Sequence, residues 1–150
     1  MVRTRYRAPH MPSLGQIMAS PPVKVILNAQ QQSDLKKIKS IAKRGEYIAK
    51  AYLESKYKKI NFNCNKIKGA DISAMVDGVH TAFEVKATRD KNIALEKLKV
   101  SSEDSHNLIV GGITVLRVME ADQKEPKVSE LRHGVDFNLK AEGRWRAEKP

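Results

Sequence analysis

Two acidic residues and a lysine flank a strong hairpin signal near the middle of the 150-residue chain. The dipeptide Asp77-Gly78 favours a two-residue type I′ turn, because both central positions of that turn need a positive φ. In the antiparallel pair that this turn creates, Asp71 faces Glu84, and Lys86 lies two residues further along the same face. Two carboxylates beside an amine could bind a divalent cation and act on a phosphate.

Carboxylates that face each other across a sheet repel, so the fold needs something to offset that repulsion. A bound Mg²⁺ would do so, since this ion takes oxygen ligands from one or two carboxylates and completes its shell with water and phosphate oxygens. Pairing of each carboxylate with a nearby lysine is the alternative, and the register alone does not choose between them. The opposite face of the hairpin is uniformly apolar and suits a core, with Ile72, Ala74, Val76, Phe83, Val85 and Ala87.

The order of these residues resembles the motif of the PD-(D/E)XK nuclease superfamily. Asp71 is followed by twelve residues and then by Glu84-Val85-Lys86, whereas the proline of the motif is replaced by Ala70. The resemblance covers roughly residues 33 to 119 and includes a preceding helix with Glu46, a position from which that family often supplies a further acid. It implies an α/β (α+β) fold of the restriction-endonuclease-like kind, a central mixed β-sheet flanked by helices.

The resemblance also implies a chemistry and a set of roles. Asp71, Glu84 and the carbonyl of Val85 would bind Mg²⁺, for which Mn²⁺ can substitute, while Glu46 would complete or orient the site. Lys86 would polarise the attacking water in the hydrolysis of a DNA phosphodiester. Restriction-type and archaeal-type Holliday-junction-resolving enzymes both fit, and a homodimer is expected because two strands are most simply cut by two sites. The downstream Gln-Tyr motif of the exonuclease type is missing.

The chain has a formal net charge of +11, and the positive charge is concentrated in its first half. Residues 1–32 carry four basic residues and no acid, and residues 33–68 carry eleven basic and three acidic residues. This asymmetry indicates a polyanionic partner, most simply DNA, and leaves open a non-catalytic basic nucleic-acid-binding module as the alternative function. The candidate DNA-binding residues are Lys43, Arg44, Lys66, Lys68 and Arg89.

The elements that must position the site can be outlined from periodicity and turn residues. Residues 1–32, with four prolines, are expected to form a flexible basic arm, in which 23–27 could be a short edge strand, and residues 33–150 a single domain. One helix is expected over 33–56, capped by Ser33, weakened at Gly45 and carrying Glu46 on or beside its apolar stripe. A second helix is expected to start at Ser101 and Ser102, to run through Leu108 and to stop at the glycine pair at 111–112. Strands are expected over 60–63, 70–76, 79–87, 92–100, 113–119, 128–131 and 135–139.

Several classes of protein and of partner are disfavoured. The single cysteine excludes an intrachain disulfide and a zinc site built from cysteines. The sequence has neither the apolar run of ~20 residues that spans a bilayer nor a secretory leader, so we expect an intracellular protein of the cytoplasm, the nucleoid or a virus-infected cell, without a membrane partner. Trp145 could stack on a base or anchor the C-terminal segment on the core.

Overall fold

The computed structural model describes residues 21–142 and 144–150, which form strands, α-helices and one 3₁₀ helix. None of the helices in this described part is long and apolar enough to cross a membrane. The elements are β1 (Val23–Lys24), α1 (Ala29–Lys36), α2 (Ile41–Lys56), β2 (Ile60–Asn61), β3 (Ile72–Val76), β4 (Val79–Ala87), η2 (Leu95–Lys97), β5 (Lys99–Val100), α3 (Glu103–Val110), β6 (Thr114–Met119), β7 (Lys127–Leu131), β8 (Asn138–Glu142) and β9 (Arg144–Glu148).

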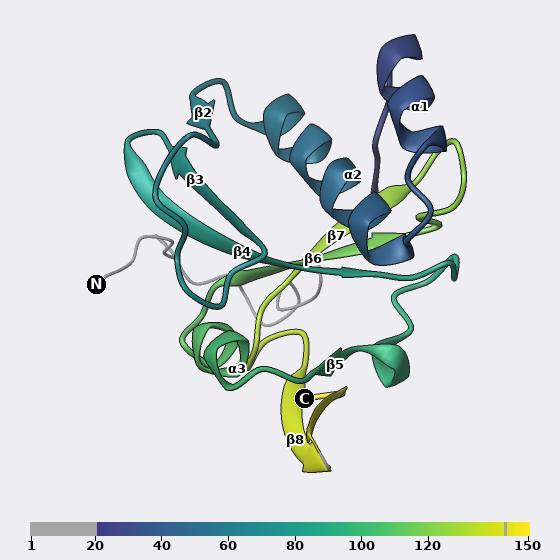
Figure 1. The fold of residues 1–150 in the computed structure, drawn as a ribbon. Coiled ribbons are helices and arrows are strands. Elements are labelled where there is room, and N and C mark those ends of the chain that lie inside the picture. The colour runs from purple at the N-terminus through teal and green to yellow at the C-terminus, as the bar shows by residue number, and fades with distance from the viewer. Residues whose placement is uncertain (1–20, 143) are drawn as a thin grey trace.

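A mixed six-stranded sheet forms the centre of the fold, in the order β1-β7-β6-β4-β3-β2. Its pairs are antiparallel except for β4 and β6, which are parallel and are joined through the segment that contains α3. A second sheet has the order β5-β9-β8. Helices α1 and α2 lie on one side of the large sheet, and α3 and the small sheet lie on the other (Figure 1). The mixed α/β architecture predicted from the sequence is confirmed.

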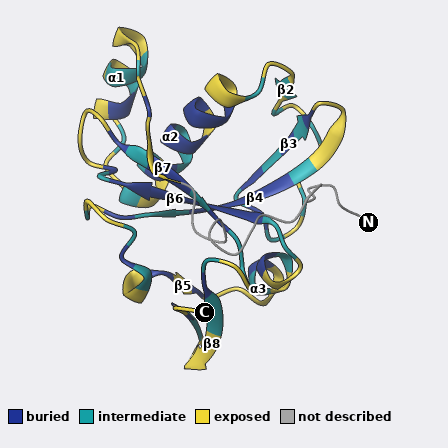
Figure 2. Cartoon of the chain, turned by 180° about the vertical axis from the view of Figure 1, so that it is seen from behind, coloured by how far each residue is buried: buried dark blue, intermediate teal, exposed yellow. Residues whose placement is uncertain are grey.

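Two apolar clusters fill the space on the two sides of the large sheet. The first joins α2 to the predicted apolar face of the hairpin and contains Ile48, Leu53, Ile72, Phe83 and Val85. The second lies among α3, β6 and the small sheet and includes Ile109, Val115 and Phe137. Strands β4 and β6 are largely coloured as buried (dark blue) in Figure 2, whereas the tip of the β3–β4 hairpin is coloured as exposed (yellow). Glu84 therefore belongs to a strand that is packed on both faces.

The hairpin forms as the sequence predicts. Asp77 and Gly78 have φ values of 49° and 82°, and Val76 pairs with Val79. The predicted α3 is also confirmed, with Ser102 as its N-cap and Gly111 as its C-cap. Local turn chemistry decides both features, because the positive φ and the side-chain cap each depend on residues adjacent in sequence.

The expectation of one helix over 33–56 is wrong, since the chain forms α1 and α2 with a break between them. Asn28 caps α1 through a capping box, and Ser40, not Ser33, caps α2. The side chain of Arg44 stabilises the break by donating to the carbonyls of Leu35 (2.6 Å) and Ile38 (3.4 Å). Residues 21–32 of the expected arm carry β1 and the start of α1, whereas residues 1–20 lie outside the described part of the chain.

Two further segments differ from expectation. Residues 92–100 contain η2 and only a two-residue strand, because Ala94 has a φ of 49° that interrupts any extended run. The strand expected over 135–139 begins at Asn138, and its partner β9 is absent from the expectations. Strands β6 and β7 match the expected ranges to within one residue.

Candidate metal and phosphate site

The Asp71 carboxylate lies directly before β3 and against the backbone of β4. Its Oδ2 accepts a hydrogen bond of 2.8 Å from the N–H of Val85, and its own N–H donates to the carbonyl of Phe83 at 3.1 Å. The regular ladder ends at the pair of Ile72 and Phe83, so Asp71 shares Phe83 with Ile72 rather than forming a regular pair with Glu84. The predicted proximity of the two acids is thus confirmed, although their register is shifted by one residue.

Glu84 is a buried acid with an unused oxygen. Only 3% of the residue is exposed, and its Oε1 has no hydrogen-bond partner among the described residues. Its Oε2 lies 3.5 Å from Nζ of Lys86. Burial above all, and then the negative charge of Asp71, raise the pKa of Glu84 to about 7, against the opposing effect of Lys86. Because a buried polar atom without a partner is costly, this oxygen lies where a proton or a cation is favoured.

The backbone of Val85 contributes a third oxygen to the same place. In an extended strand, the N–H and the C=O of one residue point to the same edge. Since the N–H of Val85 reaches Asp71, its carbonyl points to that edge too, just beyond the start of β3. The side chain of Val85 is buried in the core on the α2 side. The carbonyl of Val85, a predicted metal ligand, therefore faces the edge of β4 at which the Asp71 carboxylate lies.

Helix α2 brings Glu46 close to these groups through the glycine that precedes it. A Cβ atom on Gly45 would lie 2.5 Å from Cβ of Ala87, so the helix crosses β4 at a distance that only glycine permits. Burial raises the pKa of Glu46, and so does the negative charge of Asp71, whereas Lys50, Lys66 and Lys43 lower it. The predicted weak point in the helix is thus the contact that places Glu46 near the site.

The acids do not form a three-carboxylate cage. Within residues 21–142 and 144–150, no group of three or more His, Cys, Asp or Glu side chains could hold a metal ion. Glu46 is therefore near Asp71 without joining Asp71 and Glu84 in one ligand set. Two carboxylates and a carbonyl leave positions for water and for a phosphate, which is the usual arrangement for Mg²⁺.

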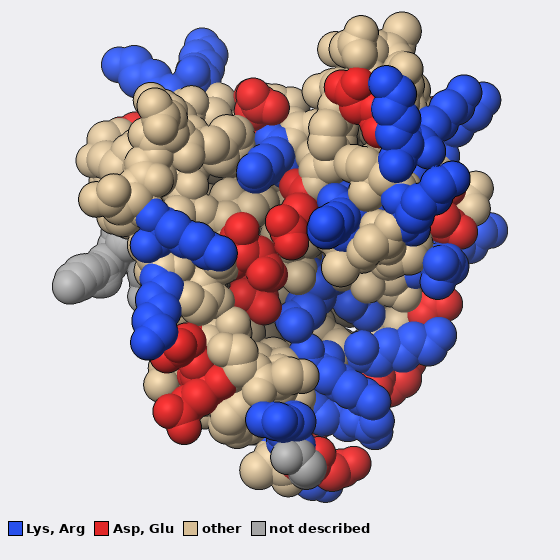
Figure 3. Space-filling model, in the orientation of Figure 1, with Lys and Arg blue, Asp and Glu red and all other residues tan. Residues whose placement is uncertain are grey.

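Basic side chains surround this acidic centre. Figure 3 shows acidic groups gathered in a hollow in the middle of the face, between α2 above and α3 below, with Lys and Arg on both sides. Lys43 and Lys66 are exposed and close enough to affect Glu46. Lys68 lies 3.7 Å from Asp104 in an exposed pair that phosphate could replace. Arg89 is not brought together with these lysines, because it pairs at 3.9 Å with Asp122 in the β6–β7 turn.

The structure argues against the prediction that Arg44 binds DNA. Its Nε donates to the carbonyl of Ala121 at 2.7 Å, and its Nη1 donates to Leu35 and Ile38. The guanidinium is thus committed to joining the α1–α2 break to the β6–β7 turn. A DNA phosphate would have to compete with backbone acceptors that the fold needs, so the structure gives Arg44 a structural role.

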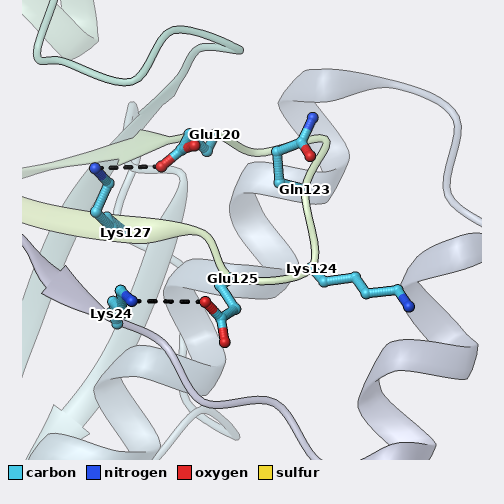
Figure 4. Close-up of a pocket in the computed structure, with 6 residues that line it drawn as sticks. All are labelled: Lys24, Glu120, Gln123, Lys124, Glu125 and Lys127. Carbon is cyan, nitrogen blue, oxygen red and sulfur yellow. Dashed lines mark ion pairs between the residues drawn. The ribbon is translucent and has the colours of Figure 1, made fainter.

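A separate pocket of about 450 Å³ lies at the β6–β7 turn, away from the acidic hollow (Figure 4). Four of its charged residues form two ion pairs, Lys24 with Glu125 at 3.6 Å and Lys127 with Glu120 at 3.2 Å. Glu84, in contrast, keeps an oxygen without a partner among the described residues. The hollow is therefore the stronger candidate for chemistry.

Three residues near the site were missed in the sequence. Arg117 is buried on β6 beside Lys86, and a charge inside the apolar run 113–119 was an available signal. Ser105 and Gly69 join α3 to the loop before Asp71, a contact across 36 residues that no local pattern indicates. Trp145, in contrast, was named from the sequence. It stacks on His106 with ring centres 4.2 Å apart and so anchors the C-terminal hairpin on α3, one of its two expected roles.

Comparison with known proteins assigns the chain to no family, since no family model, no curated protein and no solved structure matches it. The resemblance to PD-(D/E)XK nucleases therefore stays a prediction from Asp71, Glu84, Val85 and Lys86. What remains to support a function is the arrangement of these side chains and their surroundings.

Proposed function

We propose that the protein is a Mg²⁺-dependent endonuclease that hydrolyses phosphodiester bonds in DNA. The observation that carries this proposal is the buried Glu84, whose Oε1 has no partner among the described residues while Asp71 and Lys86 lie beside it. A structural acid at this depth would be expected to have donors for both oxygens. An acid that binds a cation instead keeps an oxygen free of protein donors, because the cation takes that position.

The oxygens present fit a magnesium ion, with manganese as a substitute. Asp71, Glu84 and the carbonyl of Val85 would hold it, and all three are the hard oxygen donors that Mg²⁺ prefers. When bound, the ion would supply charge neutralisation at the phosphate and a water of lowered pKa. The pKa of Glu84, about 7, means that the acid must give up its proton to bind the ion, so binding should strengthen as the pH rises through 7.

Lys86 provides the positive charge of the site. Its side chain is 26% exposed and its Nζ lies 3.5 Å from Oε2 of Glu84, so it can reach a group in the hollow without leaving the sheet. From there it would donate to a phosphate oxygen and stabilise the negative charge that grows in the transition state. Glu46, at the rim, would accept a hydrogen bond from the attacking water and orient it.

DNA is the substrate that the charge favours. The lysines around the hollow would bind phosphates on either side of the cleaved bond, and the basic excess of residues 1–68 would strengthen the encounter. Restriction-type and junction-resolving activities place the same demands on this site. We therefore propose DNA cleavage by a homodimer without choosing between the two.

The test compares two lysines in similar settings. Lys86 and Lys127 are each 26% exposed and each paired with a glutamate. Supercoiled plasmid and a four-way junction are incubated with Mg²⁺ and the wild type, Lys86→Met or Lys127→Met. We expect Lys86→Met to abolish cleavage and Lys127→Met to retain it. Equal cleavage by the two variants would remove Lys86, and with it the proposed site.

The alternative function, a non-catalytic nucleic-acid-binding module, is favoured by the basic charge alone. It predicts binding in gel-shift experiments with no cleavage of plasmid, junction DNA or RNA in Mg²⁺ or Mn²⁺. It also predicts that Asp71→Asn tightens binding slightly, because the variant only removes a negative charge. Loss of Mn²⁺ binding in Asp71→Asn would instead support the nuclease.

A further inference from the structure

The chain enters Asp71 from a tight turn. Ala70 donates its N–H to the carbonyl of Ile67 at 3.1 Å, and Gly69 has a φ of 91°. A turn closed in this way with a positive φ at its third residue is of type II, and glycine is the residue that takes this position without strain. Ala70 is 4% exposed, so the turn ends on a residue that is buried in the fold, although Lys68 at its second position is exposed.

This turn is packed on the first turn of α3. A Cβ atom on Gly69 would lie 2.7 Å from Cβ of Asp104 and 2.8 Å from its carbonyl carbon, distances that no side chain can occupy. Ser105, 9% exposed, donates its hydroxyl to the carbonyl of Gly69 at 2.7 Å. On the β3 side, the N–H of Ile67 donates to Oγ of Ser73 at 2.8 Å. The turn is thus held from two directions.

We propose that Ser105 and Gly69 are positioning residues that fix the Asp71 carboxylate against Val85 and Glu84. Gly69 is two residues before Asp71, and the only residue between them is buried. A shift of Gly69 away from α3 would therefore move the carboxylate out of reach of the Val85 N–H. Only the expected effect on metal binding rests on the proposed function, because it assumes that Asp71 is a ligand of the proposed metal site.

The contact is better explained by the serine and the glycine than by the nearby ion pair. Lys68 and Asp104 lie 3.7 Å apart, but their side chains are 87% and 48% exposed. Exposed pairs of this kind contribute little, whereas the part-buried hydrogen bond from Ser105 and the close contact at Gly69, which leaves no room for a methyl group, hold the turn directly. Residues behind metal ligands typically change metal affinity by 10- to 100-fold when they are mutated.

The experiment compares two buried serines. Ser105→Ala removes the hydrogen bond to Gly69, while Ser129→Ala changes a fully buried serine whose Oγ has no partner among the described residues. The first measurement is hydrogen exchange of the Val85 amide by NMR without metal. The second is Mn²⁺ affinity by calorimetry. We expect Ser105→Ala to speed exchange at Val85 and to weaken Mn²⁺ binding about 10-fold or more, with both values unchanged in Ser129→Ala.

Two further variants keep the result decisive. Ser105→Thr keeps the hydroxyl and should bind Mn²⁺ within about 3-fold of the wild type, the range expected when a buried hydrogen bond survives. Gly69→Ala should weaken binding more than Ser105→Ala does. A Ser105→Ala protein that only melts earlier, with its Val85 amide and its Mn²⁺ affinity unchanged, would overturn the proposal. A wild type that binds no Mn²⁺, with Val85 still responding to Ser105→Ala, would retain the positioning role and remove the nuclease.

Discussion

Glu84 and Arg117 are both buried charges on one face of the large sheet, and their environments differ. Arg117 is 2% exposed and donates to the carbonyls of Ile93 (2.7 Å) and Ala94 (3.1 Å). Glu84, 3% exposed on the neighbouring strand, has an oxygen without a partner among the described residues. Burial lowers the pKa of Arg117 and raises that of Glu84. The guanidinium of Arg117 uses backbone carbonyls as partners and so holds a loop, whereas Glu84 pairs with Lys86 through one oxygen and leaves its Oε1 without a partner among the described residues.

The largest contrast should appear in catalysis. Glu84→Gln removes the charge that would hold the cation and should lower plasmid cleavage by about a thousand-fold or more. The same variant should unfold less readily than the wild type at pH 8 in EDTA, because it no longer carries a buried carboxylate. Nicking rates and urea unfolding check the two halves of this prediction. Full activity in Glu84→Gln would mean that this region is as structural as that of Arg117.

The reverse pattern is expected for Arg117→Met. The part-buried carbonyl of Ile93 and the buried carbonyl of Ala94 lose their donor, so the free energy of unfolding should fall by about 4 kcal/mol. Cleavage by the protein that remains folded should change by less than about ten-fold, since the Arg117 guanidinium is occupied by the loop. Urea unfolding and cleavage at 10 °C separate the two effects. A variant that folds normally and loses cleavage would place Arg117 in the site.

Stability as a function of pH sharpens the comparison further. Because the pKa of Glu84 is raised from 4.5 to about 7, the folded protein keeps a proton that the unfolded chain has lost. The stability that Glu84 contributes is complete below about pH 4.5 and is lost as the pH rises to 7, a change of about 3 kcal/mol. It is measured as the difference between the wild type and Glu84→Gln in EDTA. Mg²⁺ at pH 8 should reduce this difference, and a flat difference across pH 4.5 to 7 would contradict the burial argument.

The smallest effects concern two neighbouring cations on α2. Lys43→Ala should weaken DNA binding only about 2- to 5-fold and reduce the slope of log affinity against log salt by about 1, because one phosphate contact is lost. Arg44→Ala should leave that slope unchanged and lower stability by about 2 kcal/mol, since three carbonyls lose a donor. Fluorescence anisotropy at several salt concentrations, with urea unfolding, distinguishes them. A slope that changes only in Arg44→Ala would reverse these assignments.

The sequence allowed the hairpin and its acids to be predicted because the information is local. Asp77-Gly78 determines the turn, and alternation then places Glu84 and Lys86 on one face and Phe83 and Val85 on the other. The shift at Asp71 could not be predicted, since it depends on how the preceding turn packs on α3. The proposed function cannot be predicted in the same way, because whether the Oε1 of Glu84, which has no partner among the described residues, binds a cation is not written in the local sequence pattern.

The errors share a cause, which is a contact between segments far apart in the chain. The break between α1 and α2 is held by Arg44, which also reaches Ala121. The irregular segment around Ala94 is held by Arg117 from the neighbouring strand β6. In both places, a side chain donates to carbonyls that a regular helix or strand would otherwise use. Helical or strand periodicity in the segment itself carries no record of such a partner.

The five residues of β3 separate the turn at Asp77-Gly78 from Asp71, and Val79 to Phe83 separate it from Glu84. Because side chains alternate between faces, one residue inserted into either strand would move a carboxylate to the opposite side of the sheet. A substitution at the exposed turn changes neither count. In homologous sequences we therefore expect the residues at the turn to vary, while the number of residues from the turn to each carboxylate stays constant. Insertions and deletions should fall at the turn and not within β3 or β4.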